Sequence, residues 1–140
     1  MHYIDTSALV AALARESGSE RIWNWLASQA EGEVAISPWV VSELSSALSI
    51  KIRSGALTVE QRAQIFANWH QLLEDGLLTL PINAAHFEAA ARFADRHELG
   101  LRAADALHLA VAADAGCTLV TLDQIMAAAA PHVGVPVEAV

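Results

Sequence analysis

Apolar residues along the chain form short continuous runs, separated by longer stretches in which they recur with the period of a helix. We expect strands in the short runs, at residues 2–5, 33–37, 77–81, 118–121 and 135–140. Pro136 would confine the last strand to an edge of the sheet, because proline lacks the N–H that a central strand donates. The stretches between the runs predict helices at residues 8–14, 20–28, 38–53, 58–75, 83–97, 103–115 and 124–130.

Local signals mark where several of these helices begin. The hydroxyls of Thr6 and Ser7 are expected to cap the first helix, and Pro38 suits the first turn of the third. Thr58, followed three residues later by Gln61, is typical of a capping box. Because strands and helices alternate, the pattern predicts an α/β fold with three layers, in which helices cover both faces of a mostly parallel sheet of about five strands. We expect residues 1–140 to form a single domain.

Composition narrows the class of protein and its surroundings. Hydrophobic residues make up 54% of the chain, which favours a packed core over disorder. No apolar stretch approaches the roughly 20 residues that span a membrane, and the N-terminus shows no basic leader. With a single cysteine, Cys117, no internal disulfide can form, and we expect a buried thiol in a reducing cytoplasm. The formal charge of −8 opposes indiscriminate binding of polyanions.

Four acidic residues stand where an apolar fold has no structural need for a charge: Asp5, Glu43, Asp105 and Asp123. Each lies at the end of a predicted strand or near the start of a predicted helix. In parallel α/β folds, these positions line the edge of the sheet where ligands bind. Acids that converge repel each other unless a divalent cation neutralises them, so the four residues predict a metal site.

The residue types narrow the metal and the reaction. The chain has no Cys/His pairing with zinc spacing, no EF-hand loop and no glycine-rich phosphate loop. A site made only of oxygen ligands suits Mg²⁺ or Mn²⁺. Such ions bind phosphate oxygens, generate hydroxide near neutral pH and stabilise a leaving oxygen. Hydrolysis of phosphodiester bonds is therefore the reaction that best matches an acid-only site.

Four segments of the sequence resemble the motifs of a known family. Residues 3–10 (YIDTSALV) resemble the opening motif of PIN-domain nucleases, and residues 42–48 (SELSSAL) are similar to the second motif. Residues 101–110 (LRAADALHLA) resemble the third motif and residues 119–123 (LVTLD) the fourth. The motifs occur in the family's order over nearly the whole chain. The length and layout resemble those of VapC toxins from toxin–antitoxin pairs.

The resemblance implies a PIN-like fold and a metal-dependent endoribonuclease that uses Mg²⁺ or Mn²⁺. Asp5 and Asp105 would be the main metal ligands. Glu43 would bind the metal through water or orient the attacking water, and Asp123 would complete the site or hold a second ion. On this basis the four acids are the predicted catalytic residues.

Other residues would support the acids or hold the substrate. The resemblance implies that Ser7 and Thr121 hydrogen-bond the carboxylates and fix their geometry. Gln124 departs from the family, in which many relatives carry a basic residue after the fourth acid. This departure puts substrate binding near residue 124 in doubt. The basic residues that we expect to contact RNA phosphates are Arg102, Arg15, Lys51 and Arg53.

The likeness to VapC toxins also implies partners: a cognate VapB-type antitoxin, an RNA substrate and a second copy of the chain in a homodimer. Single-stranded or loop RNA is the expected substrate, because its phosphates can bend into a recessed site. The apolar helices predict more hydrophobic surface than a small monomer readily buries, because they carry Trp23, Trp25, Leu26 and Trp69.

Each acid also has a structural interpretation. Asp5 could serve only as a helix cap, and Glu43 could lie on a solvated helix face. Asp105 lies three residues after Arg102 and could form an ion pair with it. Asp123 could belong to an ordinary turn after a strand.

Alternative interpretations also exist for the histidines and for the function of the protein. His108 shares a helix face with Asp105 and is either a hydrogen-bonded packing residue or a catalytic base, whereas the surface is expected for His70, His86, His97 and His132. The alternative function is a non-catalytic PIN-like module that binds a basic peptide. A phosphatase with an aspartate nucleophile is disfavoured, because Ser7 stands where its second aspartate would be.

Overall fold

The computed structural model describes residues 1–14 and 19–140. It confirms the predicted α/β class, with five parallel strands in the order β3-β2-β1-β4-β5. The strands are β1 (His2–Ile4), β2 (Val34–Ile36), β3 (Leu78–Thr79), β4 (Thr118–Val120) and β5 (Val137–Glu138). Each is shorter than its predicted run, because the chain leaves the ladder within a few residues to enter a helix or loop. The edge strands β3 and β5 keep only two residues each.

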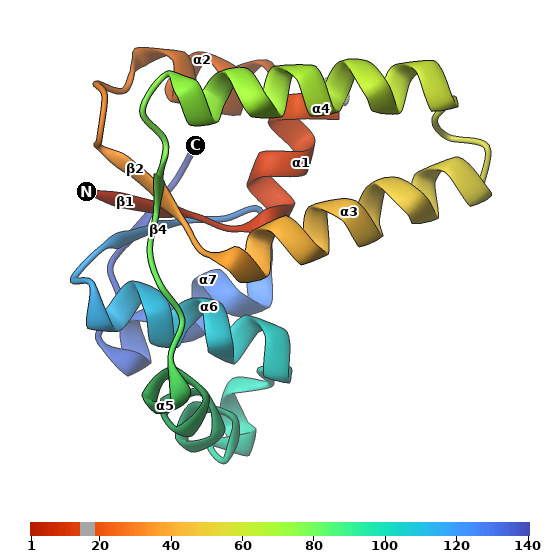
Figure 1. The fold of residues 1–140 in the computed structure, drawn as a ribbon. Coiled ribbons are helices and arrows are strands. Elements are labelled where there is room, and N and C mark those ends of the chain that lie inside the picture. The colour runs from red at the N-terminus through yellow and green to blue at the C-terminus, as the bar shows by residue number, and fades with distance from the viewer. Residues whose placement is uncertain (15–18) are drawn as a thin grey trace.

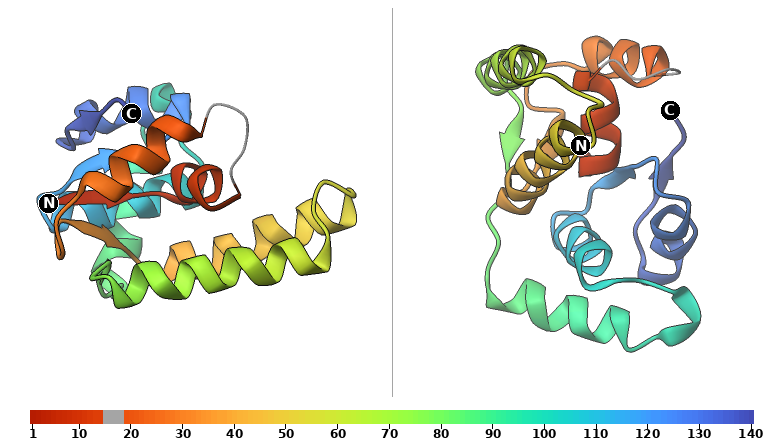
Figure 2. Two further views of the ribbon diagram at one scale, coloured as in Figure 1. Left: turned by 90° about the horizontal axis from the view of Figure 1, so that it is seen from above. Right: turned by 90° about the vertical axis from the view of Figure 1, so that its right-hand side faces the viewer.

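Helices lie on both faces of this sheet, which confirms the three predicted layers (Figures 1 and 2). One layer consists of α1 (Thr6–Ala14), α2 (Glu20–Ser28), α3 (Pro38–Arg53) and α4 (Val59–Glu74). The other contains α5 (Ala84–Ala94), α6 (Ala103–Asp114) and α7 (Gln124–Ala129), with the short 3-10 helices η1 (His97–Leu99) and η2 (Ala130–Val133). Helices α3 and α4 both extend well beyond the sheet (Figure 2, left).

The helix ends follow local capping chemistry, with one correction. The capping box before α4 is confirmed: Thr58 Oγ1 accepts the backbone N–H of Gln61 at 3.2 Å, and Gln61 Oε1 accepts that of Thr58 at 2.8 Å. The prediction that Thr6 and Ser7 cap the first helix was wrong. Helix α1 starts at Thr6, so Asp5 is the last residue outside it, and the Asp5 carboxylate accepts the backbone N–H of Ala8.

The core lies between the sheet and the helices, and α1 is buried on nearly all sides, from Ala8 to Leu13. Cys117 is fully buried, as predicted. The prediction of a surplus apolar surface was wrong for Leu26 and Trp69, because both side chains pack into the core. None of the helices in the described part of the chain is long and apolar enough to cross a membrane.

The strand order places a topological switch between β1 and β4. From β1 the chain proceeds outward to β2 and β3, and it then returns to build β4 and β5 on the other side of β1. At such a switch the connections after neighbouring strands diverge, which opens a crevice at the carboxyl ends. The backbone N–H of Asp5 donates to the carbonyl of Val120 at 3.1 Å, so the first predicted site residue lies at this switch point.

Candidate active site

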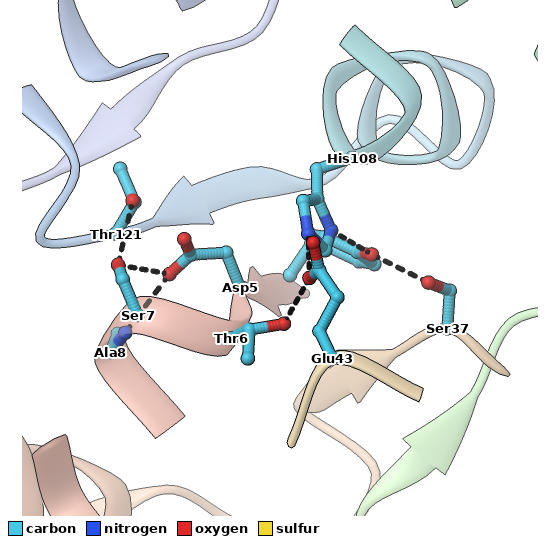
Figure 3. A network of polar contacts seen from close by, with 9 residues as sticks. Asp5, Thr6, Ser7, Ala8, Ser37, Glu43, His108 and Thr121 are labelled. Atoms are coloured by element: carbon cyan, nitrogen blue, oxygen red, sulfur yellow. Dashed lines mark hydrogen bonds and ion pairs between the residues drawn. The ribbon is translucent and has the colours of Figure 1, made fainter. Parts of the chain in front are cut away.

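Asp5 is the most buried of the four acids, with 3% of its surface exposed. Ser7 Oγ donates to its Oδ1 at 2.9 Å, and the backbone N–H of Ala8 donates to the same oxygen at 3.1 Å (Figure 3). Burial raises the pKa of Asp5, and these hydrogen bonds offset the effect only in part. A buried carboxylate without a paired basic side chain is costly, and a cation is the usual compensation.

Ser7 and Thr121 tie the start of α1 to the segment after β4. Ser7 Oγ lies 3.3 Å from Thr121 Oγ1 and accepts the backbone N–H of Leu122 at 3.0 Å. Thr121 Oγ1 in turn accepts the backbone N–H of Asp123 at 2.9 Å. Ser7 thus holds the Asp5 carboxylate directly, whereas the bond from Asp123 to Thr121 fixes the turn that carries the fourth acid.

Glu43 reaches the same edge from α3, and it is half-buried rather than solvated on a helix face. Its Oε2 accepts a hydrogen bond from the Thr6 hydroxyl and another from His108 Nε2 at 2.7 Å (Figure 3). Burial alone would raise the pKa of Glu43, but the hydrogen bonds from His108 and Thr6 outweigh it and lower the pKa. Glu43 is therefore an ionised carboxylate at neutral pH.

Asp105 and Asp123 are partly exposed, and each accepts a backbone N–H at a helix start. Asp105 Oδ2 accepts the N–H of Arg102 at 3.1 Å, and the described residues include no ion pair between these two side chains. Asp123 Oδ1 accepts the N–H of Met126 at 2.8 Å and so caps α7. Asp123 therefore does have the structural role in the turn after β4. The hydrogen bond from Met126 uses only one of its carboxylate oxygens.

The fold places all four acids at the carboxyl edge of the sheet. Asp5 follows β1 and Asp123 follows β4, while α3 and α6 bring Glu43 and Asp105 to the same edge by their N-terminal halves. Among the described residues, however, no group of three or more His, Cys, Asp or Glu side chains is already spaced to hold a metal ion. The physical reason is that each carboxylate is turned toward a hydroxyl, a histidine or a helix N-terminus.

The donor set nevertheless fits Mg²⁺ or Mn²⁺. It consists of oxygen atoms only, as these ions prefer. In each of the four acids, the hydrogen bonds described above end on a single oxygen, and a metal ion could bind the other. Asp5 and Glu43 would hold such an ion together with Asp105 and Asp123.

Part of this site was not predicted from the sequence. His108 could have had either a packing role or a catalytic one, and the structure shows a buried ring bonded to both Glu43 and Tyr3. Thr6 and Ser37 were not foreseen as members, since only the fold brings them to Glu43 and Tyr3. His86 was wrongly predicted at the surface: it is 5% exposed, because it joins α5 to α6.

The predicted RNA contacts lie at different distances from the acids. Arg102 is exposed at the start of α6, beside Asp105. Lys51 and Arg53 are in the last turn of α3, roughly 12–15 Å along the helix axis from Glu43 at 1.5 Å per residue. Arg15 lies outside the described residues.

Comparison with known proteins defines the class. The PIN domain family model matches residues 2–130, so the chain belongs to the PIN domain family. A search among curated proteins found no match.

Solved structures resemble the chain over nearly its whole length. FitAcB from Neisseria gonorrhoeae has a TM-score of 0.73 at 24% identity, covering 99% of this chain and 97% of that one. VapC20 from Mycobacterium tuberculosis, described as a sarcin-ricin loop cleaving toxin, has a TM-score of 0.68 at 25% identity, with coverages of 92% and 95%. VapBC2 from Rickettsia felis, bound to a DNA fragment from its promoter, has a TM-score of 0.68 at 18% identity, with coverages of 99% and 98%.

Proposed function

We propose that this PIN-domain protein is a Mg²⁺/Mn²⁺-dependent endoribonuclease and the toxin of a type II toxin–antitoxin pair. The observation that carries the proposal is Asp5, a buried carboxylate at the topological switch point with one oxygen outside its hydrogen bonds. The family supports nuclease chemistry. The likeness to VapC20 supports RNA as the substrate class.

The residues divide the work by position. Asp5 and Asp105 would ligate the ion, and Asp123 would complete its shell from the turn after β4. Ionised Glu43 would bind the ion through a water molecule and orient that water for attack, because its pKa is lowered and it stays a hydrogen-bond acceptor at neutral pH. The ion, when bound, would neutralise the phosphate and polarise the water. Arg102 would contact a flanking phosphate, and Lys51 and Arg53 would contact phosphates farther from the acids; Arg15 is proposed as an RNA contact from the sequence alone.

Cleavage assays on matched variants test the proposal. Wild-type protein, Asp5→Asn and Asp105→Asn are incubated with single-stranded and stem-loop RNA in Mn²⁺ or in chelator. Asp75→Asn is the control, because Asp75 is exposed at the end of α4, ahead of β3 and thus at the opposite edge of the sheet. We expect cleavage only with metal, its loss in the two site variants and its retention in the control. Cleavage by Asp5→Asn at the wild-type rate would refute the assignment.

Metal titration distinguishes the proposed nuclease from the alternative, non-catalytic function. A non-catalytic module that binds a basic peptide would show no Mn²⁺ binding that depends on Asp5 and Asp105. Calorimetric titration of the wild type and the two variants distinguishes the cases directly. We take residues 1–140 as one domain that acts in the cytoplasm.

The proposed partners are a VapB-type antitoxin and a second copy of the chain. A further solved structure that resembles the chain, with a TM-score of 0.64 at 22% identity, is a toxin–antitoxin complex from Klebsiella pneumoniae, which supports the antitoxin. Exposed Val41 and Phe87 support self-association: Phe87 lines an apolar cavity of about 230 Å³ with Trp39 and Leu107. Light scattering is expected to show a dimer, and a stable dilute monomer would contradict this part of the proposal.

A further inference from the structure

A chain of buried hydrogen bonds runs from the sheet to Glu43 and is not needed by the metal ligands themselves. Ser37 Oγ lies 2.7 Å from Tyr3 Oη, which lies 2.8 Å from His108 Nδ1, and His108 Nε2 lies 2.7 Å from Glu43 Oε2 (Figure 3). The side chains of Tyr3, Ser37 and His108 are at most 3% exposed. Three elements far apart in sequence, β1, the start of α3 and α6, therefore converge on one carboxylate oxygen.

The direction of each hydrogen bond follows from the partners. Glu43 is ionised and can only accept, so His108 Nε2 carries a proton and donates it. Burial raises the pKa of the Tyr3 phenol, so Tyr3 stays protonated and can donate to Nδ1. Ser37 then donates to the Tyr3 oxygen. Each polar atom in the chain has a partner, and with Tyr3 as the donor to Nδ1 the imidazole is the tautomer with its proton on Nε2.

The consequence lies in how Glu43 is presented. Its bonds from His108 and Thr6 both end on Oε2, so rotation of the carboxylate would break two hydrogen bonds, one of them buried. Oε1 takes part in neither bond and is fixed in direction by them. A mobile side chain loses conformational entropy when it binds a ligand. A carboxylate that is already held in place presents its oxygen without that cost.

We propose that His108 is a positioning residue that, locked by Tyr3 and Ser37, orients Glu43 toward the site at the carboxyl edge. This inference rests on the proposed function, since it assigns a task to Glu43 within that site. His108 does not touch substrate or metal in this assignment; it acts through Glu43. The same arrangement explains why α6, whose other buried residues are all apolar, carries a buried histidine at this position.

The experiment compares His108 with a histidine that is equally buried elsewhere. His86 is 5% exposed, accepts the N–H of Asn83 at 3.0 Å and lies 3.1 Å from Asp114, but it joins α5 to α6 away from Glu43. The variants are His108→Leu, His108→Gln, Tyr3→Phe and, as control, His86→Gln. Gln at position 108 can still donate an N–H to Glu43, and Leu cannot.

The first readout is Mn²⁺ affinity, measured by calorimetry on variants whose fold is verified by circular dichroism. We expect His108→Leu to weaken Mn²⁺ binding about 10- to 100-fold. Tyr3→Phe is expected to weaken it less, His108→Gln to recover most of the affinity, and His86→Gln to leave it at the wild-type level. A folded His108→Leu protein with wild-type affinity would overturn the proposal and leave His108 as a packing residue.

The second readout needs neither metal nor activity. Nitrogen NMR of the imidazoles is expected to show the His108 proton on Nε2, and its shift should change in Glu43→Gln. A ring with no proton on Nε2, or a shift that is insensitive to Glu43→Gln, would overturn the proposal. If wild-type protein neither bound Mn²⁺ nor cleaved RNA, the proposed function would fail, while the NMR result would still decide whether His108 orients Glu43.

Discussion

Asp5→Asn is expected to stabilise the metal-free protein even as it removes activity. Asparagine keeps a side-chain oxygen that can accept the bonds from Ser7 and Ala8, and it remains a good helix cap. Exchanging two charge-assisted hydrogen bonds for neutral ones costs about 1–2 kcal/mol. The ionised carboxylate, however, bears a burial penalty of several kcal/mol. The net gain is on the order of 1–2 kcal/mol, which raises Tm by about 4 °C for each kcal/mol in a chain of this size.

The gain in stability from Asp5→Asn should increase with pH. Burial raises the pKa of Asp5 above its unfolded value, so between the two values the folded protein binds more protons than the unfolded chain. The stability of the wild type therefore falls as pH rises through this window. Asp5→Asn has no such group, so its advantage is fully present above the folded pKa and disappears in acid.

Thermal unfolding of both proteins in chelator, across a pH series, measures this effect. Asp123→Asn is the control, because Asp123 also caps a helix but is partly exposed, and little change is expected there. Added Mn²⁺ should raise the Tm of the wild type and not that of Asp5→Asn. A Tm that is lower in Asp5→Asn than in the wild type at neutral pH would show that the carboxylate stabilises the fold, and the reasoning would be refuted.

Three further outcomes concern the scaffold. Leu119→Ala, at a fully buried position of the interior strand β4, should lower the free energy of unfolding by about 2–5 kcal/mol in urea titrations; a loss below about 1 kcal/mol would contradict the packing described. Thr58→Ala removes the Thr58 side chain from the capping box of α4 and should cost about 1 kcal/mol while RNA cleavage stays unchanged. Trp25→Phe removes the 2.9 Å bond from Trp25 Nε1 to Glu138 and should cost about 1 kcal/mol, and unchanged stability would show that this bond adds nothing to the docking of β5.

Local patterns in the sequence predicted the features that depend on neighbouring residues. The order of strands and helices, the Thr58–Gln61 box and the placement of Asp5 after a strand all follow from periodicity and capping rules. The bonds from Glu43 to Thr6 and His108 span 37 and 65 residues, and that from Tyr3 to His108 spans 105. No local pattern encodes such pairings, since they exist only after the sheet has brought α3 and α6 together.

The same reason explains the errors at single residues. Whether Asp5 or the hydroxyls after it would cap α1 depended on the last paired residue of β1, which periodicity locates only to within a residue or two. The burial of His86 depended on the packing of α5 against α6. The four acids could be placed at one edge because each lies at the end of a predicted strand or near the start of a predicted helix, but the direction in which each carboxylate turns could not be predicted.

The central claim is that the carboxylates at the switch point hold a divalent ion. Crystals of the wild-type protein soaked in Mn²⁺ test it most directly through the anomalous scattering of the metal. We expect a peak with Asp5 and Asp105 oxygens at about 2.1 Å, and with Glu43 within reach directly or through water. The account would be contradicted if the crystals bound Mn²⁺ elsewhere on the protein but showed no anomalous peak at the carboxyl edge of the sheet.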